Sequence, residues 1–390
     1  MTVMKTLSRA DSANGFSIME LMVAMAISMI LLMSIASVFT TSIATRETID
    51  REGRKIENAR YSIDTLAEDI RLAGYYGNYA PPVTGANPAD WKYVAPCDVT
   101  GGSPLPGWNA TTTPVQVPFA IFGYEAHGTG SLPISTLTSC LDNYKTGTDV
   151  LVIRRASTTA IDAAGAAFVS GDTYLQVSSC PDGTVDTQPF HAKATTSRSA
   201  FNLHVLGCAS TTYAVVRKLI TRIYYISICD DCVNDLDNNA ATTGDGIPTL
   251  KLVELAIPST GGTVLKVIEN LRTIAPGIEN MHIEYGIDTD DNGSIDAWVV
   301  SNENPRRTGA TGTAVTGMRL DASTENRWED VMAVKLFLIS RDLTSTPGYT
   351  DTKSFTLGSA SVAAAGDAYH RRMTSTTVKA VNMSGRREVP

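Results

Sequence analysis

One short acidic segment has the side chains of a calcium-binding loop. Asp288, Asp290, Asn292 and Asp296 stand at alternating positions around Gly293, a residue that suits a turn. Carboxylate and amide oxygens spaced in this way are ligands that calcium prefers. The twelfth position is a valine, so the bidentate glutamate that ends an EF-hand loop is missing. The segment therefore predicts a calcium site outside an EF-hand, and the alternative is a type I′ hairpin turn at Asn292-Gly293.

Six cysteines could supply a metal site, a redox pair or disulfides. Cys229 and Cys232 form a Cys-x-x-Cys pair, but the sequence has no second pair of this kind and no histidine near it. A four-ligand zinc set is therefore poorly supported. An even number of cysteines is compatible with disulfides in an oxidising compartment. We predict structural disulfides and leave their pairing open among Cys97, Cys140, Cys180, Cys208, Cys229 and Cys232.

Residues for catalysis are not grouped in a recognisable motif. The sequence has no glycine-rich phosphate loop, no His-Glu-x-x-His helix and no nucleophile elbow. Serine, aspartate and histidine occur throughout, and a catalytic triad leaves no local signature in a single sequence. We expect a protein without enzymatic activity. The histidines, which lack the spacing of metal ligands, are His127, His191, His204, His282 and His370.

The overall charge argues against a nucleic-acid-binding protein. The formal net charge is −8, whereas phosphate recognition needs clustered lysine and arginine. One small basic cluster lies near the C-terminus, and we expect it to be a solvated strand edge. It consists of Arg371, Arg372, Lys379, Arg386 and Arg387.

An uncharged segment near the N-terminus is long enough to cross a membrane. Leu21 to Phe39 is a run of 19 residues without a charge, and as a helix it spans about 28 Å. A secretory signal has a shorter apolar region, although Ser42-Ile43-Ala44 could serve as its cleavage site. A plain membrane anchor fits the length but leaves Glu20 unexplained. A carboxylate at the start of an apolar helix needs a partner.

The residues before this run resemble the type IV prepilin signal. Gly15 is followed by Phe16, and Glu20 is the fifth residue after that bond. The resemblance implies that a prepilin peptidase cleaves after Gly15 and methylates the amine of Phe16. It also implies that this amine pairs with Glu20 of a neighbouring subunit during assembly. Such a pair removes two unpaired charges from apolar surroundings.

The helix is expected to continue beyond the membrane segment, to about residue 73. Apolar residues recur along one face, and charged residues occupy the other. Gly74 then ends the pattern. We divide the chain into a leader (1–15), a membrane or filament-core helix (16–40), an amphipathic continuation (41–74) and a head (75–390). The apolar face consists of Ile56, Ala59, Ile63, Leu66, Ala67 and Ile70.

The end of this helix resembles the PilW-like minor pilins. Asp69-Ile-Arg71-Leu-Ala-Gly74-Tyr75 matches the sequence with which their first helix closes. Members often carry a cysteine shortly after the glycine, where this chain has Asn78. Weaker similarity extends through Gly147–Val150, Gly246–Leu250, Gly277–Asp288 and Val331–Arg341.

The remaining sequence predicts a β-rich head, so the fold class is α+β: a long N-terminal helix packed on an antiparallel sheet. Residues 75–139 read as loops with short strands. The runs that alternate or are rich in β-branched residues predict strands. These are Asp149–Arg154, Thr173–Val177, Phe201–Leu206, Tyr213–Ile228, Thr249–Ala256, Ile278–Ile287, Ala297–Val300, Val331–Arg341 and Met373–Met383.

The resemblance implies a minor pilin that helps to initiate type IV pilus assembly at the pilus tip. Its expected partners are other minor pilins, the major pilin, the prepilin peptidase, the inner-membrane assembly platform and a tip adhesin. The expected location is a single-pass inner-membrane protein with its head in the periplasm, and afterwards the pilus at the cell surface. Twitching motility and adhesion are the associated processes. The alternatives are a type II secretion pseudopilin and a pilin-like membrane-anchored adhesin or sugar-binding module.

Overall fold

A computed structural model provides the fold. It describes residues 17–81, 90–94, 96, 107–126, 141, 143–161, 168–169, 171–180, 182–195, 197–232, 244–256, 259–260, 263–264, 267–288, 290, 292–301 and 328–385. The chain divides into two units, Met1–Arg54 and Lys55–Pro390. Gly15, Phe16, Cys97 and Cys140, which the sequence singled out, lie outside the described residues.

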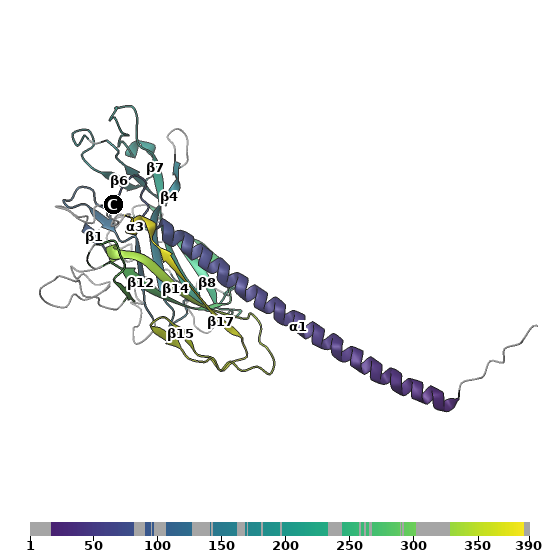
Figure 1. Ribbon diagram of the computed structural model, residues 1–390. Coiled ribbons are helices and arrows are strands. Elements are labelled where there is room, and N and C mark those ends of the chain that lie inside the picture. Colours follow the sequence, from purple (N-terminus) through teal and green to yellow (C-terminus); the bar gives the residue numbers. More distant parts are fainter. Residues whose placement is uncertain are drawn as a thin grey trace, which may run out of the picture. The chain divides into compact units, whose positions relative to one another are not determined.

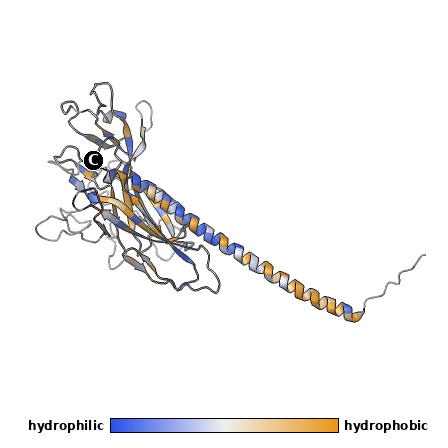
Figure 2. Ribbon diagram, in the orientation of Figure 1, coloured by the Kyte–Doolittle hydropathy of each residue, from blue (hydrophilic) through white to orange (hydrophobic). Residues whose placement is uncertain are grey.

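Helix α1 (Ile18–Leu72) is continuous, as the sequence predicted (Figure 1). From Ile18 to Asp50 its residues are exposed, and Figure 2 shows hydrophobic colours along the N-terminal part of this helix. Hydroxyl side chains within it donate to carbonyls one turn earlier, as Ser28 does to Ala24 (2.7 Å) and Ser34 to Ile30 (2.9 Å). These bonds satisfy polar groups that would otherwise be costly among apolar residues.

The last part of α1 belongs to the second unit and packs in the head. Ala59, Leu66, Ala67 and Ile70 are buried, as the predicted apolar face requires. Ile56 was assigned wrongly to this face, because it is 44% exposed. Its neighbour Lys55 is buried instead, where its ammonium forms an ion pair with Asp342 (3.1 Å). The buried face of α1 thus includes a charged side chain with a buried partner, whereas the apolar period predicts only aliphatic side chains there.

The head contains a seven-stranded sheet and a four-stranded sheet. In the larger sheet the order is β11-β8-β7-β4-β3, and β5 pairs with both β6 and β7. In the smaller sheet the order is β13-β12-β14-β17. The pairings within both sheets are antiparallel. Three two-stranded pairs complete the strands: β1 with β2, β9 with β10, and β15 with β16.

The elements are numbered in chain order, and Figure 1 labels part of them. Two short 3-10 turns, Arg198–Ala200 and Trp328–Asp330, and a final helix, α3 (Val381–Ser384), accompany the strands. The strands are β1 (Asp90–Lys92), β2 (Gln116–Pro118), β3 (Ile121–Tyr124), β4 (Val150–Ile161), β5 (Thr173–Val177), β6 (Phe190–Ala194), β7 (Val216–Ser227), β8 (Thr249–Ala256), β9 (Ser259–Thr260), β10 (Thr263–Val264), β11 (Val267–Pro276), β12 (Ile278–Ile287), β13 (Ala297–Val299), β14 (Val331–Arg341), β15 (Phe355–Leu357), β16 (Ala360–Val362) and β17 (Arg371–Lys379).

One hydrophobic core joins the end of α1 with both sheets. Leu66 of α1, Phe122 of β3, Tyr224 of β7 and Leu336 of β14 all belong to it. Apolar area removed from water in this way is worth about 25 cal/mol per Å². The α+β architecture predicted from the sequence is therefore confirmed.

Most predicted strands are present, and two predictions were wrong in part. Phe201–Leu206 is not a strand. The backbone of this segment pairs with the side chain of Gln176: the side-chain nitrogen donates to the Leu203 carbonyl (3.1 Å), and the Leu203 amide donates to the side-chain oxygen (2.9 Å). The closing strand ends at Lys379, and residues 381–384 form helix α3. Strand β11 was missed, as were the shorter strands β6, β9, β10, β15 and β16.

Candidate assembly site

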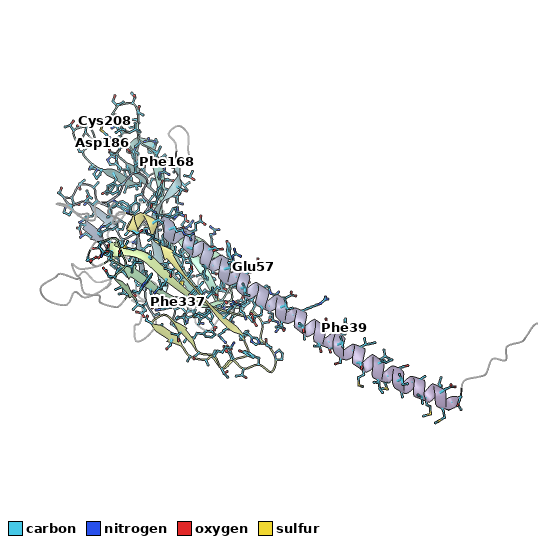
Figure 3. All side chains as sticks on the ribbon, viewed as in Figure 1. Phe39, Glu57, Phe168, Asp186, Cys208 and Phe337 are labelled. Atoms are coloured by element: carbon cyan, nitrogen blue, oxygen red, sulfur yellow. A yellow bond between two sulfur atoms is a disulfide. The ribbon has the colours of Figure 1, made fainter. Side chains whose placement is uncertain are left out.

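The first unit offers an apolar helix surface that no described residue of that unit covers. The large hydrophobic side chains between Ile18 and Phe39 are exposed, and Phe39 points away from the helix in Figure 3. Among the described residues, α1 is the one helix that is long and apolar enough to cross a membrane. A helix that is hydrophobic on every side is stable only within lipid or among other helices.

Glu20 has a contact within its own subunit that the sequence analysis did not predict. Its carboxylate accepts a hydrogen bond from the Ser17 amide (3.3 Å), while the Ser17 hydroxyl accepts one from the Met19 amide (3.3 Å). Ser17 stands just before α1, and Glu20 is its third residue, which is the sequence pattern of a capping box; here the hydroxyl bonds to the second amide of the helix rather than the third. The Ser-x-x-Glu pattern could have shown this. Glu20 thus stabilises the start of its own helix in the single subunit.

The end of α1 is held in the head by a buried ionic cluster around Asp69, here called the Asp69 cluster. Its carboxylate contacts the guanidinium groups of Arg155 (3.0 Å) and Arg222 (2.8 Å) and accepts the hydroxyl hydrogen of Tyr224. Burial and the neighbouring Asp69 charge raise the pKa of Tyr224, so its hydroxyl remains a donor. Arg222 also pairs with Glu254 (3.0 Å). The cluster joins α1 to strands β4, β7 and β8.

Gly74 makes the turn that ends α1. Its φ is +71°, a conformation that residues with a side chain rarely adopt, and a Cβ atom there would lie 2.8 Å from the sulfur of Met383. The Gly74 amide donates to the Arg154 carbonyl (3.0 Å), so the chain passes directly from helix to sheet. The side chain of Asn382 donates to the carbonyls of Arg71 (3.0 Å) and Ala73 (3.3 Å). The C-terminal helix therefore caps the first one.

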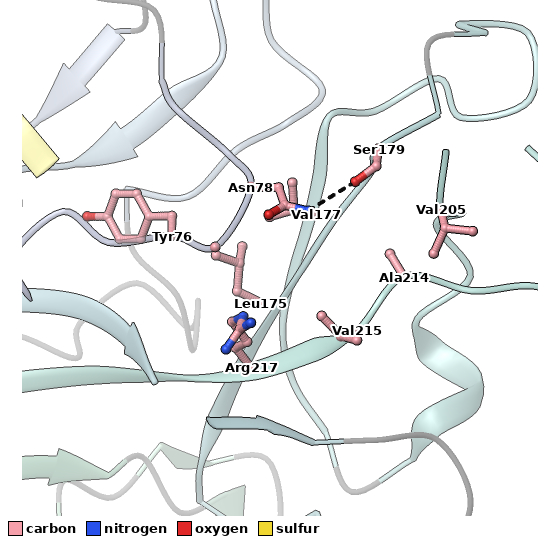
Figure 4. A pocket seen from close by; sticks show the side chains of 10 residues that line it. Tyr76, Asn78, Leu175, Val177, Ser179, Val205, Ala214, Val215 and Arg217 are labelled. Atoms are coloured by element: carbon pink, nitrogen blue, oxygen red, sulfur yellow. Dashed lines mark hydrogen bonds between the residues drawn. The ribbon is translucent and has the colours of Figure 1, made fainter. Parts of the chain in front are cut away.

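A small pocket of about 150 Å³ lies where the chain leaves this turn (Figure 4). Tyr76 and Asn78 form one side, and Leu175, Val177 and Arg217 lie on the opposing strands. The side-chain nitrogen of Asn78 donates to the Ser179 hydroxyl (3.4 Å), the dashed line of the figure. Asn78 stands at the position where the resemblance to PilW-like pilins implied a cysteine. Here a hydrogen bond, rather than a covalent bond, ties this segment to the end of β5.

All four cysteines that the structure describes are paired. Cys180 bonds to Cys208 with their Cα atoms 5.1 Å apart, and Cys229 bonds to Cys232 with a separation of 5.3 Å. The prediction of structural disulfides agrees with this geometry, and the structure supplies the two pairings that the sequence left open. Cys229 and Cys232 are both buried.

The acidic loop joins β12 and β13, so its flanks are strands, as predicted. One carboxylate oxygen from each of Asp288, Asp290 and Asp296 lies within 4.8 Å of the others. Gly293 has a φ of +82°, the left-handed conformation that suits a turn. Asp288 is buried, and its carboxylate accepts hydrogen bonds from the backbone amides of Asn292 (3.2 Å) and Gly293 (2.9 Å). Calcium binding stays a prediction.

Part of the basic C-terminal cluster is neutralised within the head. The Arg371 guanidinium contacts the carboxylates of Glu279 (3.1 Å), Asp351 (2.9 Å) and Asp367 (2.6 Å). Burial works against the charged form of Glu279, but hydrogen bonds from Arg371 and the charge of Lys145 hold its pKa below the ordinary value. Hydrogen bonds from Arg371 also lower the pKa of Asp367. Strand β17 is an edge strand, as expected, but the expectation of a solvated cluster was wrong for Arg371, which is buried. Arg386 and Arg387 lie outside the described residues.

Two family models match the chain, at its beginning and in the head. Residues 11–36 match the prokaryotic N-terminal methylation motif. Residues 224–382 match the model of type IV pilus-assembly protein W, which spans the strands from β8 to β17. No curated protein sequence matches at a significant level.

A search of solved structures found a type IV-like pilin from Thermus thermophilus. It is 14% identical, the match covers 42% of this chain and 79% of that one, and the TM-score is 0.18. A TM-score this low does not establish a shared fold, so the architecture rests on the helix and sheets described above. The methylation motif, the exposed apolar helix and the match in the head together identify the family: the chain is a type IV pilin-like protein with a PilW-type head.

Proposed function

We propose that this chain is a minor pilin that takes part in initiating type IV pilus assembly and is located in the complex at the pilus tip. The observation that carries the proposal is the exposed, uncharged helix surface between Leu21 and Phe39, with the carboxylate of Glu20 at its start. Lipid can cover this surface before assembly, and neighbouring helices can cover it afterwards. The protein acts as a structural subunit in this role.

In the proposed mechanism, the prepilin peptidase cleaves between Gly15 and Phe16 and methylates the new amine of Phe16. The cut leaves Ser17 and Glu20 in the mature chain, so the capping box survives processing. The amine of one subunit then approaches Glu20 of its neighbour. Since a carboxylate has several lone pairs, Glu20 can accept the incoming amine and the Ser17 amide together.

The helix is proposed to cross the inner membrane with the leader in the cytoplasm and the head in the periplasm. There the head would meet other minor pilins, the major pilin and a tip adhesin, while the helix meets the assembly platform. The Asp69 cluster supports these separate roles of the helix and the head. It fixes the end of α1 in the head, so that a force on the helix reaches the sheets through charge-assisted bonds.

Variants of Glu20 in a deletion strain test the mechanism. Glu20→Gln retains a capping side chain but removes the charge, and Glu20→Ala removes both. Glu47→Gln is the matched control: it lies on the same helix, and its partner Arg51 is on the same surface (3.0 Å). We expect both Glu20 variants to be processed but to lose surface pili, whereas Glu47→Gln assembles normally. Normal piliation by Glu20→Gln would contradict the charge-pairing mechanism.

The deletion strain itself separates the candidate functions. Loss of surface pili and twitching, restored by the wild-type chain, supports the minor pilin. Secreted enzymes retained in the periplasm, with pili intact, would indicate a type II secretion pseudopilin instead. Intact pili with lost attachment would indicate an adhesin or sugar-binding module that uses the same export route. Electron microscopy, a motility assay and assays of secreted enzyme activity give the three measurements.

A further inference from the structure

A serine, a histidine and an aspartate from distant parts of the sequence lie close together in the head. The side chain of His282, on β12, is completely buried. Its Nε2 atom lies 3.3 Å from the Ser359 hydroxyl, and its Nδ1 atom lies 2.9 Å from a carboxylate oxygen of Asp149. A hydroxyl, an imidazole and a carboxylate connected in this order can activate the hydroxyl as a nucleophile.

The packing around His282 and Asp149 fixes their positions. The Asp149 carboxylate accepts the backbone amides of Ala126 (3.1 Å) and Ile283 (2.9 Å), so it is held by more than the imidazole. The ring of His282 stacks on Phe337 of the neighbouring strand β14, with the ring centres 6.1 Å apart. Phe337 is marked in Figure 3. A base whose orientation is set by packing loses little entropy when it takes up a proton.

Ser359 is at the tip of the β15–β16 hairpin and is exposed. The preceding residue, Gly358, has a φ of +60°, and a Cβ atom there would lie 2.2 Å from a carboxylate oxygen of Glu284. Only glycine fits this position without displacing that carboxylate. The hairpin therefore places the hydroxyl against His282 while leaving it open to a molecule from solvent.

We propose that Ser359 is an activated serine that accepts acyl groups from small, activated carboxylic esters. Its Oγ atom attacks the ester carbonyl, and the hydroxyl proton passes to Nε2 of His282. The tetrahedral intermediate then expels the alcohol, which takes up this proton, and an acyl ester on Ser359 remains. Water attacks that ester, with His282 again acting as the base, and releases the carboxylic acid and the free serine. Asp149 is a positioning residue for the imidazole.

Glu284 sets the substrate class. Its carboxylate accepts the Ser359 amide (2.8 Å), so this amide is not available to a developing oxyanion. The negative charge beside the nucleophile also repels anionic esters, while Lys335 (3.8 Å from Glu284) offsets it only in part. The site therefore favours neutral or cationic esters with a good leaving group, such as a phenol, over amides. This chemistry is independent of the role of the chain in pilus assembly.

Labelling with a fluorophosphonate tests the proposal on the full chain in detergent. Ser359 Oγ attacks the phosphorus, fluoride leaves, and the proton is taken up by His282, so the adduct reports the activated hydroxyl directly. Ser361 is an internal control, since it is an exposed serine on the same hairpin. General-base assistance contributes about 10²-fold or more. We therefore expect peptide mass spectrometry to show labelling of Ser359 at least about 100 times faster than that of Ser361. Equal labelling would overturn the proposal.

Variants of Ser359, His282 and Asp149 test the role proposed for each residue. Ser359→Ala should abolish labelling and p-nitrophenyl acetate hydrolysis, whereas Ser361→Ala should change neither. His282→Gln should lower labelling of Ser359 by about 100-fold. Asp149→Asn should lower it similarly while the head still unfolds cooperatively, and Asp149→Glu should restore part of the rate. Unchanged labelling in a folded His282→Gln protein would contradict the proposal without depending on the Asp149 variants.

Discussion

Replacing Asp69 by asparagine removes the charge at the centre of the Asp69 cluster while keeping the shape of the side chain. The Asp69 side chain is 3% exposed, and that of Arg155 is 10% exposed. Arg222 keeps its contact with Glu254, but among the described residues Arg155 has no other carboxylate within 4 Å. Breaking a buried pair by removing one partner costs about 3–5 kcal/mol. Because the asparagine oxygen can still accept hydrogen bonds, we expect the lower value, about 3 kcal/mol.

Thermal unfolding of the full chain in detergent, followed by near-ultraviolet circular dichroism, measures this effect. A large domain loses about 2 °C per kcal/mol, so Asp69→Asn should lower Tm by about 6 °C. The matched control is Asp64→Asn on the same helix. Asp64 and Arg60 form an exposed pair (3.7 Å), and such pairs contribute about 0–1 kcal/mol. The control should therefore shift Tm by less than about 2 °C.

A double variant decides whether the loss comes from the pair. In Asp69→Asn/Arg155→Met, the buried cation that the first change leaves unpaired is also removed. The combined destabilisation should therefore be smaller than the sum of the two single effects, by about 1–3 kcal/mol. Equal Tm values for Asp69→Asn and Asp64→Asn, or strict additivity in the double variant, would refute the assignment of the Asp69 cluster as the anchor of α1.

Three further perturbations follow from the head. Gly123→Ala should lower Tm by several degrees, because its Cβ atom would lie 1.9 Å from the Tyr285 hydroxyl; overpacking costs about 1–3 kcal/mol or more. The folded-state pKa of Glu279 is lowered, so its stabilisation is present above the ordinary carboxyl pKa and is lost as the pH falls below about 4. Melting curves between pH 5 and pH 3 should show this loss in the wild type and a flatter dependence in Arg371→Gln. Millimolar calcium should raise Tm in the wild type and not in Asp288→Asn; calorimetry without a calcium response would end the calcium hypothesis.

The sequence predicted the parts of the fold that have a clear period or composition. The limits of α1 and of strands β5, β8, β12 and β14 follow from local patterns, because burial on one face or in a continuous apolar run leaves a regular signal. Strand β11 was missed, since its residues alternate weakly and it pairs with β8 at the edge of its sheet. Lys55 was missed because its partner Asp342 is far away in the sequence.

The functional residues also fall into those that a local sequence pattern reveals and those that only the tertiary structure reveals. Glu20 could be found because one carboxylate interrupts an apolar segment. Asp69 was part of a recognised sequence, but its role depends on Arg155 and Arg222, which pairing of β4 with β7 brings to it. Asp149, His282 and Ser359 carry no local signal at all. Only the tertiary structure places them in contact.

The central claim is that the N-terminal segment is processed and used as a pilin helix. Mass spectrometry of the N-terminus of the mature protein, purified from its native host, tests it most directly. The proposed mechanism predicts a chain that begins at Phe16 with a methylated amine, and a chain that retains the residues before Phe16 when the prepilin peptidase is deleted. A mature chain that begins at Thr45 would contradict it, because cleavage after Ser42-Ile43-Ala44 removes Glu20 and the apolar helix surface altogether.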